Sequence, residues 1–427
     1  MKKIFTIIII AFLLLGNLSK TINAETINPP IVSGDGIVLM DATTGEILYG
    51  KNIDEPFHPA STTKIMTALL TIENTKPDDV VTTSNDFTTK NHDLIEGNGI
   101  SLKSGEQMKV KDLLYALLLP SANDSAVALA EHISGSVPDF AKLMNKRAKE
   151  LGCTTANFEN PNGLYGEKHV VSAKDLALIF RKLSTYPEFR QIATTAYYSI
   201  PATNKTDQAT STKNRTIRNE DKLVHKGTSD YCEGIDGGKT GYTTQSLHSY
   251  VAAATRNGHR LIVTIMHSND QKYFLDANAL FDYGFANFNL TKKFSKGDFV
   301  TYYKESNGKK IPLVAGKDFY YVSNKSSTSK PSFKFNNNSI KLNKFYKDEQ
   351  VTNIELTLDG KPIGTLNLLS GANYSPNFLS SNYNALNLAK AKIIYLIIGI
   401  LVFILIIALV IYRKKKSKKK NFKDYFK

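Results

Sequence analysis

Ser61 and Lys64 have the residue types and the spacing of a nucleophile and its base. They stand in the run PASTTK (59–64), and an apolar stretch follows over 65–72. This pattern predicts a helix that begins near Ser61 and enters a core, and residues three apart share one helix face. A serine hydroxyl needs a base within hydrogen-bond reach, and burial lowers the pKa of a lysine toward that role. The pair therefore predicts nucleophilic catalysis.

Two later motifs add polar groups of the kind that bind a substrate. Ser121 and Asn123 occupy the link between two predicted helices, 110–119 and 124–133, and Lys239 lies in GGKTGYT (237–243). A lysine is a point charge suited to a carboxylate, and glycines on both sides allow a backbone or a ligand to approach closely.

Each motif alone has an ordinary structural alternative. Ser-x-x-Lys recurs at 306–309, 327–330 and 417–420, in polar or charged stretches. Ser and Asn favour turns, and Asp124 would cap the following helix well. A glycine-rich turn with a solvated lysine is the alternative for the third motif. The prediction of a site depends on the three motifs together.

The elements that must position these residues form an α+β domain over 25–287. Strand-like runs at 36–40 and 46–49 are joined by a turn, and runs at 249–255 and 261–267 flank Asn257-Gly258, a strong hairpin signal. Helices are predicted over 140–151 and 172–183, the latter capped by Ser172, and 76–108 reads as an irregular loop region. Short β-type segments at 299–303, 319–322, 332–335, 354–358 and 363–366 then predict a small all-β domain over 288–373.

Both ends of the chain point to export and a membrane. Lys2 and Lys3 precede a short apolar run (4–15), and a small residue, Ala24, stands before position 25. This pattern predicts a cleaved signal peptide over 1–24, with an uncleaved anchor as the alternative. A polar stalk (374–392) precedes twenty uncharged residues (393–412), long enough to cross a bilayer, and a basic tail follows (413–427). The positive-inside rule places this tail in the cytoplasm and the body outside; a buried core helix is the alternative for the span.

The distribution of charge along the chain argues against a nucleic-acid-binding protein. The formal net charge is +15, but the basic residues in excess lie mostly at the two ends, so the body is close to neutral and nucleic-acid binding is not indicated. Cys153 and Cys232 would face an oxidising compartment, where they could pair or remain small buried hydrophobes. No Cys/His cluster has metal-ligand spacing, and we expect neither a metal nor another cofactor.

Taken together in this order, Ser-x-x-Lys, Ser-x-Asn and Lys-Thr-Gly form a recognised catalytic set. The chain resembles the low-molecular-mass penicillin-binding proteins, the serine-type D-Ala-D-Ala carboxypeptidases of a peptidase S11-like family, over about residues 30–285. The stretches that carry the resemblance are PASTTKIMTA (59–68), ANDSAVALAEH (122–132), NPNGL (160–164) and DGGKTGYT (236–243).

The resemblance implies a β-lactamase/transpeptidase-like fold, a helical cluster on an antiparallel sheet with the cleft between them. It also implies that Ser61 attacks the carbonyl between the two terminal D-alanines of a peptidoglycan stem peptide, that Lys64 takes its proton, and that Ser121 relays protons to the leaving D-alanine. Water then hydrolyses the acyl-enzyme, which limits cross-linking, and β-lactams acylate Ser61 in the same way.

Binding roles follow from the same resemblance. Asn123 is expected to orient the substrate amide, and the backbone N–H groups of Ser61 and Tyr242, the latter following Gly241, to hold the oxyanion. Lys239 and Thr240 are expected to hold the terminal carboxylate. The chain departs from the family after Thr243, where Leu247 stands near an expected glycine. A larger side chain there would narrow the cleft or alter specificity.

Three other functions are compatible with the sequence or must be weighed against it. A class A β-lactamase would need a further glutamate in a Glu-x-x-Leu-Asn context, which does not occur here. An endopeptidase or transpeptidase would act on the same bond type with the same residues. A non-catalytic wall-binding protein of the same fold is the third, and failure to bind penicillin would mark it.

Overall fold

The computed structural model describes residues 28–305, 308–336, 340, 344–375 and 378–424, with the backbone alone described over 378–389 and 416–424. The chain forms two compact units. One ends at Thr291 and also includes Tyr320–Thr328, and the other comprises Lys292–Phe319 and the chain from Ser329 onward. The predicted signal peptide (1–24) lies outside the described residues.

An antiparallel sheet of five strands lies at the centre of the first unit, in the order β2-β1-β11-β10-β9. Successive residues of a strand point to opposite faces. Accordingly Ile37 and Leu39 pack with helix α11, whereas Val38 and Met40 join the core of the helical cluster. The strands are β1 (Gly36–Asp41), β2 (Ile47–Lys51), β9 (Ile235–Thr243), β10 (Leu247–Arg256) and β11 (His259–Ser268).

The predicted hairpin between β10 and β11 is confirmed. Asn257 and Gly258 have φ angles of 52° and 77°, the left-handed pair that a two-residue turn needs.

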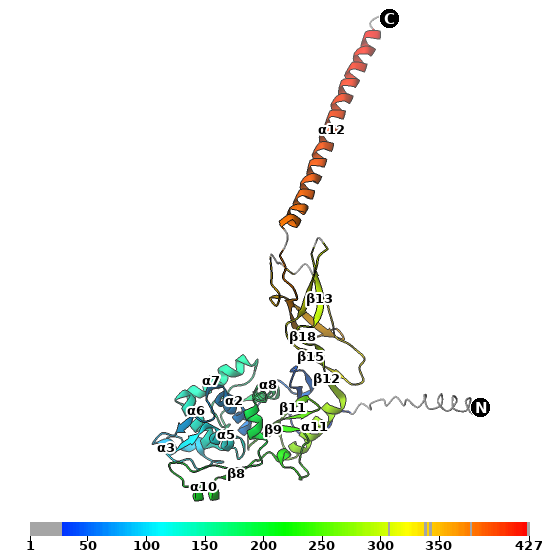
Figure 1. Ribbon diagram of the computed structural model, residues 1–427. Helices are drawn as coiled ribbons and strands as arrows, with labels where there is room; N and C mark the ends of the chain where they lie inside the picture. The colour runs from blue at the N-terminus through cyan, green and yellow to red at the C-terminus, as the bar shows by residue number, and fades with distance from the viewer. Residues whose placement is uncertain (1–27, 306–307, 337–339, 341–343, 376–377, 425–427) are drawn as a thin grey trace, which may run out of the picture. The chain divides into compact units, whose positions relative to one another are not determined.

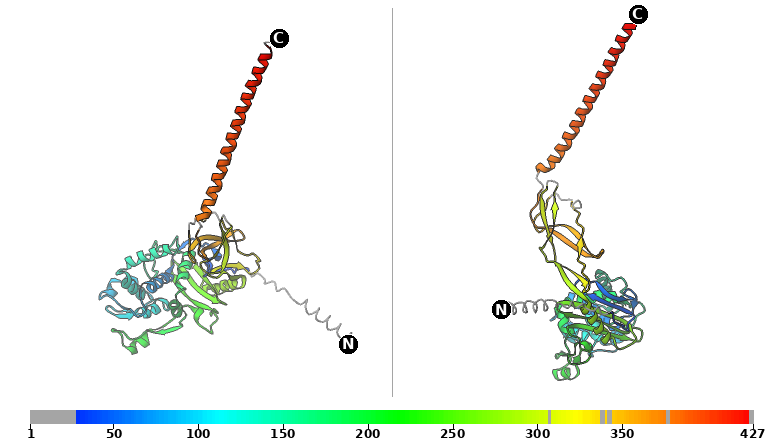
Figure 2. Two further views of the ribbon diagram at one scale, coloured as in Figure 1. Left: turned by 45° about the horizontal axis from the view of Figure 1, so that its top comes forward. Right: turned by 90° about the vertical axis from the view of Figure 1, so that its right-hand side faces the viewer.

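Helices cover both faces of this sheet, with α8 on one side and α11 on the other (Figure 1). Figure 2 shows the cluster in blue and cyan beside the green strands. The prediction that Ser172 caps α8 is confirmed, because its side chain accepts the N–H of Asp175 at 3.1 Å. The main helices are α2 (Lys64–Asn74), α5 (Val110–Leu118), α6 (Asn123–Ser134), α7 (Val137–Glu150), α8 (Ala173–Leu183) and α11 (Tyr273–Asn287).

Residues 76–108 are more ordered than the sequence indicates. They contain strands β4 (Val80–Thr82) and β5 (Gln107–Lys109) and short helices α3 (Phe87–Lys90) and α4 (His92–Ile95). Asp124 contributes to this order and is not the cap of α6, which is Ala122. Its buried carboxylate accepts the backbone N–H groups of Ile100 and Leu102, each at 3.0 Å, and so ties the loop to the helix.

Shorter elements complete the first unit. They are β3 (Pro56–Phe57), 3-10 helix η1 (Ala60–Thr63), β6 (Val171–Ser172), α9 (Pro187–Ala193), β7 (Tyr197–Ser199), α10 (Gln208–Asn214), β8 (Thr216–Arg218) and 3-10 helix η2 (Lys222–Val224).

The all-β character predicted for 288–373 is confirmed. Its five-stranded antiparallel sheet has the order β13-β14-β18-β17-β16, and β12 pairs with β15. Strands β12 and β14 were not among the β-type segments predicted from the sequence, and Pro312 interrupts the strand pattern of β14. The strands are β12 (Phe288–Phe294), β13 (Phe299–Lys304), β14 (Lys310–Ala315), β15 (Phe319–Asn324), β16 (Ser332–Phe333), β17 (Gln350–Leu358) and β18 (Lys361–Ser370).

A single long helix, α12 (Phe378–Asp424), ends the described chain, in red in Figure 1. It begins within the segment predicted as a polar stalk and contains the whole predicted span of 393–412. The part Lys390–Lys415 is long and apolar enough to cross a membrane, and none of it is buried.

Candidate active site

Ser61 and Lys64 meet as the sequence predicts. Ser61 lies in η1 and Lys64 begins α2, so the lysine Nζ is 3.1 Å from the serine Oγ. Lys64 is fully buried and also donates to Oδ1 of Asn123 and to the carbonyl of Asn162, both at 2.8 Å. All three acceptors are neutral groups.

This environment lowers the pKa of Lys64 well below its usual value. Burial is the largest cause, and Lys239 adds to it, while Glu220 and Asp124 act in the opposite direction. A neutral amine at this distance is placed to accept the proton of the Ser61 hydroxyl.

The turn 160–164 supports Lys64, and no role was predicted for its residues from the sequence. Asn162 supplies the carbonyl acceptor, and Gly163 has a φ of +88°. A Cβ at Gly163 would lie 1.8 Å from the carbonyl oxygen of Ala60, itself at a φ of +48°. Only glycine therefore lets this turn approach the residue that precedes Ser61.

A buried histidine, His169, is hydrogen-bonded to Thr63 of η1. Nδ1 of His169 accepts the N–H of Glu159 at 3.2 Å, so we assign its proton to Nε2, which donates to Oγ1 of Thr63 at 2.9 Å. Burial lowers the pKa of His169 to about 4, so the ring is a neutral support for Thr63, the residue that precedes Lys64.

The link between α5 and α6 brings Ser121 and Asn123 to the cavity that Ser61 lines. Asn123 receives a hydrogen bond from Lys64 and donates its Nδ2 to the carbonyl of Glu96, so it positions the lysine directly. Ser121 has a φ of +66°, a costly conformation for serine. Its buried Oγ has no hydrogen-bond partner within the described part of the chain, which leaves it available to a substrate.

Strand β9 forms the opposite wall and is an edge strand. A Cβ at Gly241 would lie 2.9 Å from the backbone nitrogen of Ser61 and 3.0 Å from that of Thr62. The glycine therefore allows β9 to lie directly against η1, beside the nucleophile.

The predicted residues surround one cavity of about 530 Å³. Ser61, Ser121, Asn123, Thr240, Gly241 and Tyr242 line it, and the two lysines, Lys64 and Lys239, are buried behind its wall. All eight residues predicted from the sequence are therefore brought together.

The cavity also has lining residues that the motifs did not reveal. Glu220 is one, and its carboxylate lies 4.0 Å from Nζ of Lys239. His248 and Tyr273 are others; their rings stack, with centroids 5.4 Å apart, and His248 also contacts the exposed ring of Tyr242. None of these three belongs to a recognisable motif, so only the packing identifies them.

Leu247 does not narrow the cavity, which was one of the two effects expected from the sequence. It is half-buried and is absent from the lining. Its φ of +50° explains why a glycine suits this position, because the left-handed conformation is costly for a branched side chain.

The two cysteines do not pair. Cys153 and Cys232 are both free and buried, and burial raises the pKa of the Cys232 thiol to about 11. Of the two alternatives, the structure supports small buried side chains.

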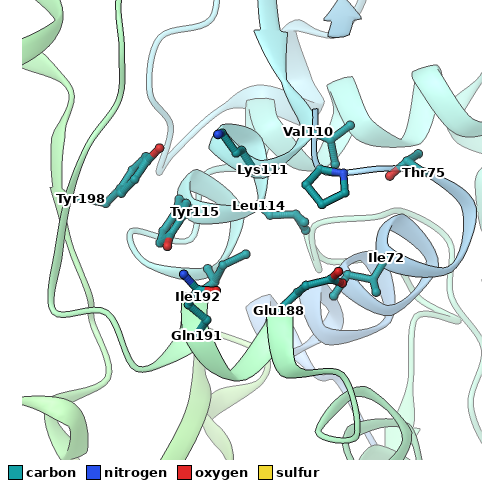
Figure 3. A pocket seen from close by; sticks show the side chains of 11 residues that line it. Ile72, Thr75, Val110, Lys111, Leu114, Tyr115, Glu188, Gln191, Ile192 and Tyr198 are labelled. Atoms are coloured by element: carbon teal, nitrogen blue, oxygen red, sulfur yellow. The ribbon is translucent and has the colours of Figure 1, made fainter. Parts of the chain in front are cut away.

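A second hollow, of about 290 Å³, lies between α2, α5 and α9 (Figure 3). Apolar groups dominate its wall, with Leu114, Ile192 and the stacked rings of Tyr115 and Tyr198 among them. It contains none of the predicted site residues and no serine-lysine pair, so the chemistry belongs to the first cavity.

Comparison with known proteins agrees with this assignment. The family model for D-alanyl-D-alanine carboxypeptidase (peptidase S11) matches residues 23–270, and the C-terminal domain of penicillin-binding protein 5 matches residues 288–375. The Bacillus subtilis D-alanyl-D-alanine carboxypeptidase DacF is 33% identical over 64% of this chain and 67% of its own length.

Solved structures extend the similarity to the fold. Penicillin-binding protein 5 from Haemophilus influenzae is 28% identical with a TM-score of 0.68, covering 82% of this chain and 99% of that protein. A mutant of a Streptomyces DD-transpeptidase is 29% identical with a TM-score of 0.55, covering 60% and 99%. The penicillin-binding fold predicted from the sequence is thus confirmed, and the chain belongs to the D-alanyl-D-alanine carboxypeptidase family of S11 peptidases.

Proposed function

We propose that this protein removes the terminal D-alanine from peptidoglycan stem peptides through a Ser61 acyl-enzyme. The contact between Lys64 and Ser61 carries the proposal: a buried amine with neutral acceptors lies 3.1 Å from the hydroxyl that it would deprotonate. Family membership supports the same substrate class.

The first half of the reaction is acylation. Ser61 Oγ bonds to the carbonyl carbon of the penultimate D-alanine while Lys64 takes its proton. The N–H groups of Ser61 and Tyr242 stabilise the oxyanion, a role consistent with the close approach of β9 to η1 at Gly241. The C–N bond then breaks, and the proton held by Lys64 passes through the Ser121 hydroxyl to the departing amine, which leaves Lys64 neutral again.

The second half is deacylation. Water attacks the ester carbon while Lys64 takes a proton from it. The Ser61–carbon bond then breaks, Lys64 returns this proton to Ser61 Oγ, and the shortened peptide is released. Throughout, Asn123 orients the peptide amide, and Lys239 with Thr240 holds the carboxylate of the terminal residue. A β-lactam would form the same ester with Ser61.

The location follows from the two ends of the chain. A signal peptide would export the protein, and the helix around 393–412 would hold it in the membrane, with the catalytic unit outside and the basic tail in the cytoplasm. The enzyme would then face its wall substrate.

A second activity on the same bond type is favoured by one observation, the similarity to a DD-transpeptidase. In a transpeptidase an amine of a second peptide, instead of water, attacks the acyl-enzyme. The residues of the cavity serve both reactions.

The test uses the full chain in detergent with a pentapeptide that ends in D-Ala-D-Ala. We expect release of D-alanine and labelling by a fluorescent penicillin, both lost in Ser61→Ala. Labelling without release would favour a transpeptidase or endopeptidase. Rapid turnover of penicillin without a lasting adduct would favour a β-lactamase, and neither labelling nor release would favour a non-catalytic wall-binding protein.

A further inference from the structure

Lys222 is the one lysine or arginine that lines the cavity, within the described part of the chain. Its side chain is 61% exposed. Lys239, by contrast, is buried behind the wall, where its Nζ donates to the carbonyl of Thr240 at 3.0 Å. A negatively charged ligand that enters the cavity can therefore approach the ammonium group of Lys222 directly.

Two independent sets of contacts place Lys222 at the Thr240 end of the cavity. Along the chain, Lys222 comes two residues after Glu220, whose Oε2 lies 3.4 Å from Oγ1 of Thr240. In space, Nζ of Lys222 lies 5.7 Å from the ring centroid of Phe274, and this ring packs against Tyr250 with centroids 5.1 Å apart. Tyr250 is the cross-strand partner of Thr240. Both routes lead to the place assigned to the carboxylate of the terminal D-alanine.

The backbone of Lys222 is fixed, whereas its ammonium group is held weakly. Lys222 begins η2, and the buried Asp221 before it accepts the N–H of Leu223 at 3.0 Å. At the far end of the side chain, Nζ lies over the ring of Phe274 and 4.0 Å from Asp230, which is too far for a hydrogen bond. The ammonium group can thus turn toward a ligand without losing a hydrogen bond to Asp230.

The charges around Lys239 also call for a second cation. The carboxylate of Glu220 lies 4.0 Å from its Nζ, and Asp221 is a further acid that acts on it. A substrate carboxylate adds another negative charge beside this single buried lysine. Negative charges that share one cation repel each other, so a second cation at Lys222 would strengthen the binding of a carboxylate.

We propose that Lys222 is a substrate-binding residue, whose ammonium group pairs with the carboxylate of the terminal D-alanine while Lys239 and Thr240 hold the same carboxylate from β9. This inference rests on the proposed function, because the carboxylate belongs to the leaving residue of that reaction. Lys222 thereby favours the end of a peptide over an internal residue, since only the terminal residue carries a free carboxylate.

The test compares two thioester substrates with the full-length enzyme in detergent. Both carry the same acyl-D-alanyl group, and the leaving group is mercaptoacetate in one and mercaptoacetamide in the other. A thioester is cleaved more readily than a peptide, so the substrate without a carboxylate still gives a measurable rate. In Lys222→Met we expect kcat/KM for the mercaptoacetate substrate to fall about three- to tenfold through KM, with little change in its kcat or in the amide.

Two further variants separate a local contact from a general effect of charge. Lys222→Arg keeps the charge and should retain most of the preference for the carboxylate. Lys226→Met is the matched control, because it removes an exposed positive charge from the same segment outside the cavity lining and should leave the ratio of the two kcat/KM values unchanged. An unchanged ratio in Lys222→Met, or an equal fall of the ratio in Lys226→Met, overturns the inference.

Failure of this inference is distinguishable from failure of the proposed function. A wild type that is not labelled by a saturating concentration of fluorescent penicillin and cleaves neither thioester overturns both. A wild type that is labelled and prefers the carboxylate substrate, together with a Lys222→Met variant of the same preference, overturns the inference alone.

Discussion

Two buried lysines stand on opposite sides of one cavity, and their surroundings differ. Lys64 is hydrogen-bonded to a hydroxyl, an amide oxygen and a backbone carbonyl. Lys239 donates to the carbonyl of Thr240 at 3.0 Å and lies near the carboxylates of Glu220 and Asp221. Burial lowers the pKa of both lysines and nearby acids oppose this effect at each of them, but only at Lys64 does the other lysine lower the pKa further.

The comparison supports the proposal that the surroundings, and not the residue type, distinguish the roles of the two lysines. An amine surrounded by neutral acceptors loses its proton readily and suits a base, whereas an amine beside carboxylates keeps its charge and suits anion binding. Four changes test this difference, beginning with the largest effect.

Lys64→Met should abolish most activity on every substrate. Methionine fills similar space but cannot take a proton, so acylation by penicillin and D-alanine release should both fall by about 10²–10⁴-fold. Stopped-flow acylation and product assays measure the two rates. Activity near that of the wild type would show that Lys64 is not the base.

Gly241→Ala should push strand β9 away from η1 and so slow acylation. The added methyl would lie 2.9 Å from the backbone nitrogen of Ser61, so β9 must move away from η1 and the oxyanion site widens. We expect acylation to slow by about 10²–10³-fold, the loss typical of one oxyanion donor. Thermal unfolding serves as the control, and a slow rate with normal stability supports the local explanation.

Lys239→Met should affect binding more than chemistry, in contrast to Lys64→Met. Loss of one charged hydrogen bond to the substrate corresponds to roughly 10–100-fold in KM for a peptide with a free carboxylate. The value of kcat should change much less. Equal losses in kcat from the two lysine variants would contradict the division of roles.

Asp221→Asn should change the pH dependence of stability. Burial raises the pKa of Asp221 to about 6, above its usual value, despite hydrogen bonds from Tyr250 and from the N–H of Leu223. The folded protein therefore binds this proton more readily than the unfolded chain, so the stability contributed by Asp221 increases as the pH falls through 6 toward 4 and is lost as the pH rises.

The measurement is urea unfolding of the wild type and Asp221→Asn at pH 7.5 and pH 5. The wild type should gain about 1 kcal/mol relative to the variant at the lower pH. Other groups, such as His169, titrate in both proteins and cancel in the comparison. If the free energies of unfolding of the wild type and of Asp221→Asn changed equally with pH, Asp221 would not be the source of the pH dependence.

Much of the site was predictable because its signals are local. The three-residue spacing in Ser61-x-x-Lys64 fixes both side chains on one face, and Asn257-Gly258 specifies its own turn. Strand β14 was missed because Pro312 hides the pattern, and Asp124 was taken for a cap because it stands where a helix begins.

The sequence by itself determined the proposed catalytic set, the fold class, the β-type second unit and the apolar span, since each depends on residue types and short spacings. Only the tertiary structure decided what surrounds the catalytic groups. Lys64 meets acceptors 59 and 98 residues away, and Thr240 meets Glu220 across 20 residues. Burial and the pairing of distant charges arise when segments pack together, and no short pattern encodes them.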